Sequence, residues 1–148
     1  MKVGDKLEAF SLQNENDETV NVGDYIGKPM VIYFYPKDDT LGCTKEACAF
    51  RDSFAEFTDA GVTVFGISAD SPKLHLKFKE KYRLPFSLLS DKGNKIRKAW
   101  KVPTGLFGLL PSRVTYIFDK EGVVKHIFNS QMRAEQHVTE SLEIIKTF

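Results

Sequence analysis

Apolar residues in this chain form short continuous runs, and stretches of helical periodicity separate these runs. The runs at 30–35 and 62–68 are apolar over most of their length, as expected for strands that are covered on both faces of a sheet. Shorter runs at 86–90, 113–118 and 123–128 predict three further strands. The chain is therefore expected to contain a buried central sheet.

Two pairs of runs predict β-hairpins. Residues 10–13 and 19–22 alternate apolar and polar positions around a polar turn near the start of the chain. Residues 113–118 and 123–128 flank a turn that ends in Gly122. The stretch from 102 to 111 contains two prolines and two glycines, and its four large apolar residues predict an apolar loop: Leu106, Phe107, Leu109 and Leu110.

The first stretch with helical periodicity follows the strand at 30–35. It begins after Thr40, a favoured N-cap residue, and runs to about Ala60, where Gly61 is expected to end the helix. Its inward positions recur at steps of three and four residues: Ala47, Phe50, Phe54 and Phe57.

Three more helices are predicted further along the chain. One opens on Ser71 as N-cap with Pro72 at its first position and extends to Tyr82, and its apolar positions are Leu74, Leu76 and Phe78. A short helix ends near Trp100. The last helix covers about 134–147, and its apolar face consists of Val138, Leu142 and Ile145.

The predicted order of elements is β-hairpin, β, α, β, α, β, α, β, β, α. Buried strands that alternate with helices indicate an α/β fold with a central mixed sheet flanked by helices and an N-terminal hairpin. No repeat, low-complexity tract or linker interrupts the 148 residues, so we expect a single domain over 1–148.

Composition and charge narrow the classes of function. The 21 basic and 20 acidic residues give a net charge of +1, and no basic block is present, so no nucleic-acid partner is indicated. The longest apolar run is too short to span a bilayer, and the first residues lack a signal-peptide core. The expectation is a cytoplasmic protein that does not interact with membranes.

The candidate chemistry lies in the loop that follows the strand at 30–35 and in the start of the next helix. Pro36 ends the strand because it has no N–H for the sheet, and Thr40 then places Cys43 in the first helical turn. A thiol in that position feels unpaired backbone N–H groups and the positive end of the helix dipole, which favour the reactive thiolate. A buried, inert core cysteine is the alternative interpretation of Cys43.

Cys48 is the second and last cysteine, five residues after Cys43. Two cysteines with three scattered histidines do not supply the ligand spacing of a structural zinc site. A phosphatase-type C-x5-R loop would need arginine at position 49, which is Ala49. The cysteines lie roughly 140° apart around an intact helix, and their Cα atoms lie roughly 8–9 Å apart. A disulfide tolerates about 7 Å, so a bond between the two would require local unwinding.

The residues of this segment resemble a known signature. Pro36-x-x-x-Thr40-x-x-Cys43 resembles the active-site motif of peroxiredoxins, and Glu46 and Cys48 at three and five residues after Cys43 are similar to the bacterioferritin-comigratory-protein, or PrxQ-type, branch of that family.

A second segment supports the resemblance, which extends from the first residues to Phe128. Residues 111–119 resemble the strand of the family that carries the active-site arginine, here Arg113. One departure is Leu41, where the branch usually has proline. Because proline suits the first position of a helix, Leu41 is expected to loosen the helix start slightly.

The resemblance implies a thioredoxin-like fold and a thioredoxin-dependent peroxidase that acts in antioxidant defence. Cys43 would be the peroxidatic cysteine and attack hydrogen peroxide or an alkyl hydroperoxide. Cys48 would resolve the resulting sulfenic acid as a Cys43–Cys48 disulfide, which thioredoxin or a glutaredoxin-like dithiol would reduce. Members of the branch are often monomers, and they require no metal, haem or flavin.

The resemblance also implies roles for the surrounding residues. The Thr40 hydroxyl would bond the peroxide or the sulfur, and Pro36 would shield the thiolate from water. Arg113 would donate to the thiolate and to the O–O group, and Glu46 would orient it. The alternatives are a plain N-cap for Thr40, a strand terminator for Pro36 and solvated surface charges for Arg113 and Glu46.

Two other functions remain open on the residues alone. A thioredoxin-type thiol–disulfide oxidoreductase is one, although its usual motif is C-x-x-C rather than the C-x-x-x-x-C found here. A redox sensor or holdase is the other, in which a disulfide would unwind the helix and expose phenylalanines. His75 is expected to be a solvated helix residue, and Trp100 with the apolar loop is expected to contribute packing.

Overall fold

The structure, a computed structural model, describes residues 1–105 and 110–148. Its main sheet has seven strands in the order β2-β1-β5-β4-β3-β8-β9. These strands are β1 Ser11–Gln13, β2 Thr19–Asn21, β3 Met30–Phe34, β4 Thr63–Ser68, β5 Ser87–Ser90, β8 Val114–Phe118 and β9 Val124–Asn129. A separate ribbon pairs β6 Thr104–Gly105 with β7 Leu110–Pro111. The prediction that Leu106, Phe107 and Leu109 line an apolar loop lies outside the described residues.

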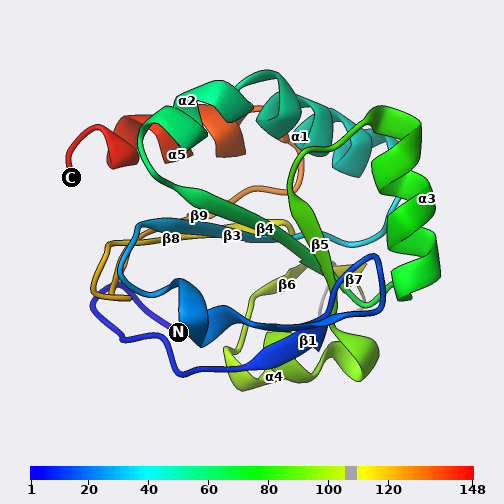
Figure 1. Ribbon diagram of the computed structural model, residues 1–148, viewed down its shortest axis with the longest axis horizontal. Coiled ribbons are helices and arrows are strands. Elements are labelled where there is room, and N and C mark those ends of the chain that lie inside the picture. Colours follow the sequence, from blue (N-terminus) through cyan, green and yellow to red (C-terminus); the bar gives the residue numbers. More distant parts are fainter. Residues whose placement is uncertain (106–109) are drawn as a thin grey trace.

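The sheet is mixed, as predicted. Strands β3, β4 and β5 run parallel, while β1 pairs with β5 and β8 pairs with β3 in the antiparallel sense. The helices are α1 Leu41–Asp52, α2 Phe54–Asp59, α3 Pro72–Tyr82, α4 Lys95–Ala99 and α5 Gln136–Ile145. Figure 1 shows the sheet nearly edge-on, with α1, α2, α3 and α5 on one side and α4 with the N-terminal segment on the other.

Both faces of β3 are covered, which explains why its sequence is apolar throughout. Val31 and Tyr33 face the core under α1 and α5, together with Cys43. Met30 and Ile32 belong to the core on the opposite face. Because alternate residues of a strand point to opposite faces, a continuous apolar run is what a doubly covered strand requires.

The prediction of one helix from Leu41 to Ala60 is wrong at one residue. The backbone leaves the helical region at Ser53, with φ −102° and ψ 8°, and separates α1 from α2. The inward positions Phe50 and Phe57 remain buried on both sides of this break. The stop at Gly61 is observed, with φ +72°.

The start of α3 is formed as predicted, because the Ser71 hydroxyl accepts a hydrogen bond from the Leu74 N–H at 3.2 Å. The predicted apolar face of this helix is partly wrong, however. Leu74 is 44% exposed, whereas His75, predicted to be solvated, is completely buried. None of the described helices combines the length and apolar content that crossing a bilayer needs.

Candidate active site

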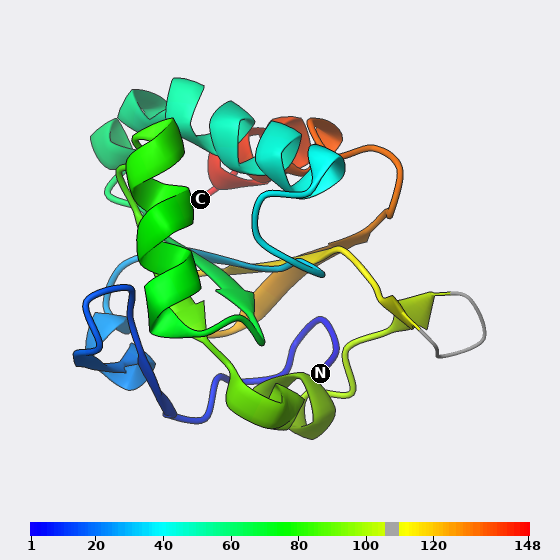
Figure 2. The ribbon, with the colours of Figure 1, turned by 90° about the vertical axis from the view of Figure 1, so that its right-hand side faces the viewer.

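The first turn of α1 carries Cys43 into the core. Figure 2 shows the loop after β3 rising from the sheet to the start of this helix. Thr40 is the N-cap residue in extended conformation, and Cys43 is the third residue of the helix. The Cys43 side chain is only 1% exposed. The sulfur therefore lies at the positive end of a 12-residue helix, in a setting that favours negative charge.

Arg113 reaches this sulfur from the neighbouring strand. It directly precedes β8, whose first residue Val114 pairs with Phe34 at the end of β3. Its Nη1 donates to Cys43 Sγ at 3.4 Å and to Glu46 Oε1 at 2.7 Å. The backbone N–H of Arg113 donates to Gln131 Oε1 at 3.0 Å, which helps to fix the residue. The structure thus brings together two candidates that are 70 residues apart in the chain.

Glu46 lies one helical turn after Cys43 and is completely buried. The alternative interpretation of a solvated surface acid is therefore wrong. Burial raises the pKa of Glu46 to about 8, and the positive charge of Arg113 opposes that rise. A carboxyl group with this pKa holds a proton much of the time near neutral pH, which leaves the charge of Arg113 available to a thiolate at Cys43.

Thr40 occupies the predicted N-cap position without capping the helix through its side chain. Its hydroxyl instead donates to the carbonyl oxygen of Lys37 at 2.9 Å. Since the hydroxyl proton is used there, the Thr40 oxygen remains able to accept a hydrogen bond from the O–H of a bound peroxide.

A cleft of about 710 Å³ opens above these groups. Its lining residues include Pro36, Thr40, Gly42 and Arg113, and the last two adjoin Cys43, which is itself buried. The opposite wall is formed by residues 131–136, which lead into the first residue of α5. Sequence reasoning missed this wall. The hairpin register, which pairs Val114 with Asn129, was the signal that could have placed Gln131 beside Arg113.

Gly42 is a second residue that sequence reasoning missed. A Cβ built at this position would lie 2.7 Å from Arg113 Nη2. Glycine within a helix costs about 1 kcal/mol relative to alanine, and this unfavourable choice could have signalled a close approach. The absence of a side chain at position 42 lets the guanidinium reach the sulfur.

We therefore expect Gly42→Ala to slow the reaction of Cys43 with peroxide by about 10- to 100-fold, because the guanidinium must move. Helix propensity favours alanine, so the midpoint of thermal unfolding should not fall correspondingly. Stopped-flow oxidation and thermal denaturation would measure the two effects. Wild-type kinetics in this variant would contradict the role given to the close approach.

His137 on α5 lies next to Glu46, on the side away from the cleft. Sequence reasoning also missed this residue. Its Nε2 donates to the Ser130 carbonyl at 2.8 Å, so in the neutral ring Nδ1 accepts from the Thr115 hydroxyl at 2.7 Å. Burial lowers the pKa of His137 to about 4. Although Nδ1 lies 3.5 Å from Glu46 Oε2, the two groups are therefore neutral neighbours rather than an ion pair near neutral pH.

The buried His137 should make the protein less stable in acid. Its pKa is about 4 in the fold and 6.5 in an unfolded chain, so the unfolded state binds the proton more tightly. The contribution of His137 to the free energy of unfolding should be greatest above pH 6.5 and fall by up to about 3 kcal/mol as the pH drops to 4, while the raised pKa of Glu46 acts in the opposite direction. Urea titrations would measure this slope. The difference between the wild type and His137→Gln, titrated in the same way, should isolate the contribution of His137.

Cys48 lies on a different side of α1 from Cys43. Its side chain is partly exposed, and its partial burial raises the pKa of the thiol. Both cysteines are free thiols, and α1 continues without a break from Leu41 to Asp52. The prediction that a Cys43–Cys48 bond requires local unwinding therefore applies to the helix as it is observed, and it stays a prediction.

Comparison with known proteins gives three findings. A family model described as the AhpC/TSA family matches residues 3–127. The chloroplastic peroxiredoxin Q of Populus jackii is 53% identical over 139 residues, which are 94% of this chain and 65% of the relative. The one from Triticum aestivum is 54% identical over 137 residues, 93% of this chain and 63% of the relative. The chain thus spans slightly less than two thirds of each.

Two solved structures are similar over nearly their whole length. Peroxidoxin BcpB from Mycobacterium tuberculosis is 32% identical with a TM-score of 0.91, and the match covers 100% of this chain and 98% of that one. Bacterioferritin comigratory protein from Xanthomonas campestris, a protein with alkyl peroxide reduction activity, is 29% identical with a TM-score of 0.86. The match covers 97% of this chain and 98% of that one.

Proposed function

Because the chain belongs to the AhpC/TSA family, which confirms the resemblance to peroxiredoxins, we propose that it is a thiol peroxidase of the PrxQ type. Its substrates would be hydrogen peroxide and small alkyl hydroperoxides. The observation that carries this proposal is the contact of one guanidinium with both Cys43 Sγ and Glu46, at the open end of a helix.

In the first step, the Cys43 thiolate attacks one oxygen of the O–O bond. The bond breaks, the sulfur takes that oxygen as sulfenic acid, and the other oxygen leaves with a proton as water or alcohol. Arg113 and the backbone N–H groups of the first turn stabilise the negative charge that moves onto the leaving oxygen. The Thr40 hydroxyl orients the peroxide by accepting its O–H.

In the second step, the Cys48 thiol condenses with the sulfenic acid, and water leaves as the Cys43–Cys48 disulfide forms. Local unwinding of α1 brings the two sulfurs within bonding distance. A dithiol such as thioredoxin or a glutaredoxin-like protein then reduces the disulfide by exchange. The thiols supply both electrons, so the proposed cycle needs no metal, haem or flavin.

The mouth of the cleft supports a role for organic hydroperoxides. Leu41 is 77% exposed and Met132 is 91% exposed, and both line the cleft. Apolar side chains held in water next to a reactive group can contact the alkyl part of a substrate. The proposed disulfide joins two thiols of the same helix, so the cycle needs no second subunit, which supports action as a monomer. A cytoplasmic location remains part of the proposal, although the plant relatives are named chloroplastic.

The proposal is tested by the intact mass of the protein before and after one equivalent of hydrogen peroxide. The wild-type protein should lose the mass of two hydrogen atoms as the disulfide forms. Cys48→Ser should instead gain one oxygen atom at Cys43. A wild-type protein that stays unmodified, or that turns over peroxide with Cys48 as its attacking thiol, would refute the proposed roles.

A further inference from the structure

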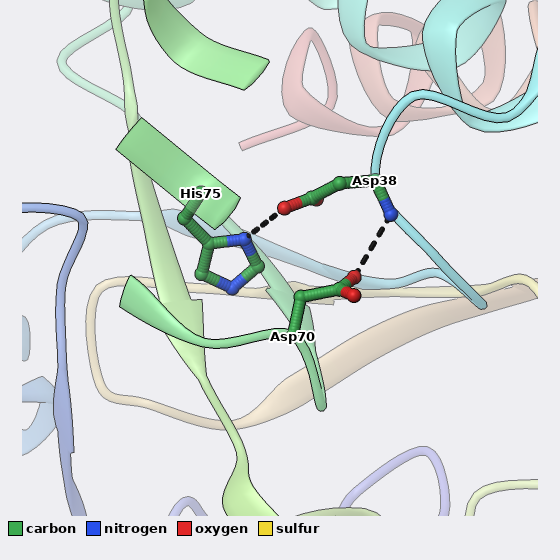
Figure 3. A group of neighbouring side chains, drawn as sticks. All are labelled: Asp38, Asp70 and His75. Atoms are coloured by element: carbon green, nitrogen blue, oxygen red, sulfur yellow. Dashed lines mark hydrogen bonds and ion pairs between the residues drawn. The ribbon is translucent and has the colours of Figure 1, made fainter. Parts of the chain in front are cut away.

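A group of three polar side chains, two buried and one half-buried, lies outside the chemistry described so far. It consists of Asp38 in the loop after β3, Asp70 after β4 and His75 on α3, which are shown in Figure 3. His75 Nδ1 lies 2.6 Å from Asp38 Oδ2, and the Asp38 backbone N–H donates to Asp70 Oδ2 at 2.8 Å. The side chains of His75 and Asp38 are 0% and 6% exposed, so this contact is shielded from water.

The hydrogen bonds within this group favour a structural role over metal binding. His75 Nε2 lies 3.0 Å from the Leu89 carbonyl oxygen, which can only accept, so Nε2 carries a proton. A second proton must lie between Nδ1 and the Asp38 carboxylate. Both ring nitrogens are therefore engaged within the protein. Asp70 Oδ2 already accepts from the Ser68 hydroxyl and from the Asp38 N–H.

The contacts instead hold Asp38, in the loop between β3 and α1, through three of its polar groups. Asp38 Oδ1 accepts from the Tyr35 hydroxyl at 2.6 Å, Oδ2 contacts His75, and the backbone N–H is held by Asp70. The next residue, Asp39, has φ +56°, a backbone conformation that residues other than glycine rarely adopt. The buried contacts at Asp38 therefore hold a loop whose backbone is unfavourable on its own.

This loop carries the groups that the proposed reaction uses. Pro36 and Thr40 line the cleft, and the Thr40 hydroxyl is oriented by the carbonyl of Lys37, the residue before Asp38. Three residues after Thr40 comes Cys43. If the loop leaves its position, Thr40 and the first turn of α1 must move with it.

We propose that Asp38 and His75 form a positioning pair that holds the Pro36–Thr40 loop and the first turn of α1 in the arrangement that reacts with peroxide. The inference rests on the proposed function and deepens it. Because disulfide formation needs the same turn to unwind, the pair acts on the two steps in opposite directions. It speeds oxidation of Cys43 and slows the capture of the sulfenic acid by Cys48.

Asp38→Asn is the direct test, because the amide keeps the size of the side chain but cannot accept from both Tyr35 and His75. We expect the second-order rate of Cys43 oxidation to fall by about 10-fold or more, and the first-order rate of disulfide formation to rise. Rapid mixing with hydrogen peroxide, acid quenching and intact-mass measurement would follow the sulfenic acid and the disulfide separately.

The neighbouring Asp39 provides a matched control. It belongs to the same loop and pairs with Lys81 and Tyr82 at 2.8 Å each, but its side chain is 44% exposed. Exposed pairs contribute little, so Asp39→Asn should keep both rates within about 2-fold of wild type. His75→Gln offers a second variant of the pair, and its effects should not add to those of Asp38→Asn in the double variant.

Opposite changes in the two steps would support the positioning role, since a general loss of stability does not speed one step while slowing the other. Unchanged rates in Asp38→Asn, or a parallel fall of both rates, would overturn it. If neither variant of the pair folds, the pair is a folding determinant and the positioning role is rejected. If wild-type Cys43 does not react with peroxide at all, the proposed function fails instead.

Discussion

Cys43→Ser should abolish turnover of peroxide, with kcat/KM at least about 1,000-fold below that of the wild type. A serine hydroxyl is far less acidic than a thiol, and its oxygen cannot take up another oxygen as sulfur does. The position is buried in the core and contacts Arg113, so a hydroxyl of similar size still finds a donor there. The measurement is peroxide consumption with a thioredoxin system, beside the midpoint of thermal unfolding.

Cys48→Ser is the matched control for this loss. It changes the same element into the same residue, but it should leave the first oxidation of Cys43 intact and stop only the formation of the disulfide. Turnover in Cys43→Ser at the wild-type rate would show that Cys43 is not the nucleophile. Loss of the first oxidation in both variants would show that the fold, rather than the sulfur, had been changed.

Arg113→Met should lower the rate of Cys43 oxidation by about 100- to 1,000-fold, the effect of losing one preorganised donor to a developing charge. Methionine fills part of the same space without a charge or a donor. Glu46 would then lose its partner, but burial has already raised its pKa to about 8, so it can stay protonated and buried near neutral pH. The second-order rate constant with hydrogen peroxide measures the loss.

Two further variants separate charge from geometry at this position. Arg113→Lys keeps the charge but lacks the planar guanidinium, whose Nη1 contacts Cys43 and Glu46 while its Nε donates to the Gln131 carbonyl, so it should recover only part of the rate. Arg83→Met removes an arginine from the C-cap of α3 and should react like the wild type. Equal rates in Arg113→Met and Arg83→Met would contradict the assigned role of Arg113.

Patterns within short windows predicted most of the fold. The continuous apolar runs of β3 and β4 and the Ser71–Pro72 start of α3 depend on neighbours in sequence, and the structure has them where they were expected. The placement of Cys43 and Glu46 on one face of α1 is similarly local, because residues three apart share one face of a helix.

Features that depend on distant residues could not be predicted in this way. His75 was expected in solvent because its partners, Asp38 and the Leu89 carbonyl, lie 37 and 14 residues away. The bond that diverts the Thr40 hydroxyl from the helix end depends on the loop conformation. The cleft wall at 131–136 needed the register of the second hairpin. Side-chain polarity gives the average environment of a residue type, but not the partner that makes burial of a polar group favourable.

Arg113 contacts Cys43 only when β8 is paired with β3, and this matters for the newly made polypeptide. During synthesis, β8 is made long after Cys43 has left the ribosome exit tunnel, so the guanidinium reaches the sulfur late. Until that pairing, the cysteine should meet oxidants as an ordinary thiol would. During refolding, sensitivity to peroxide should therefore appear together with protection of the β8 amides from hydrogen exchange, and an earlier onset would argue otherwise.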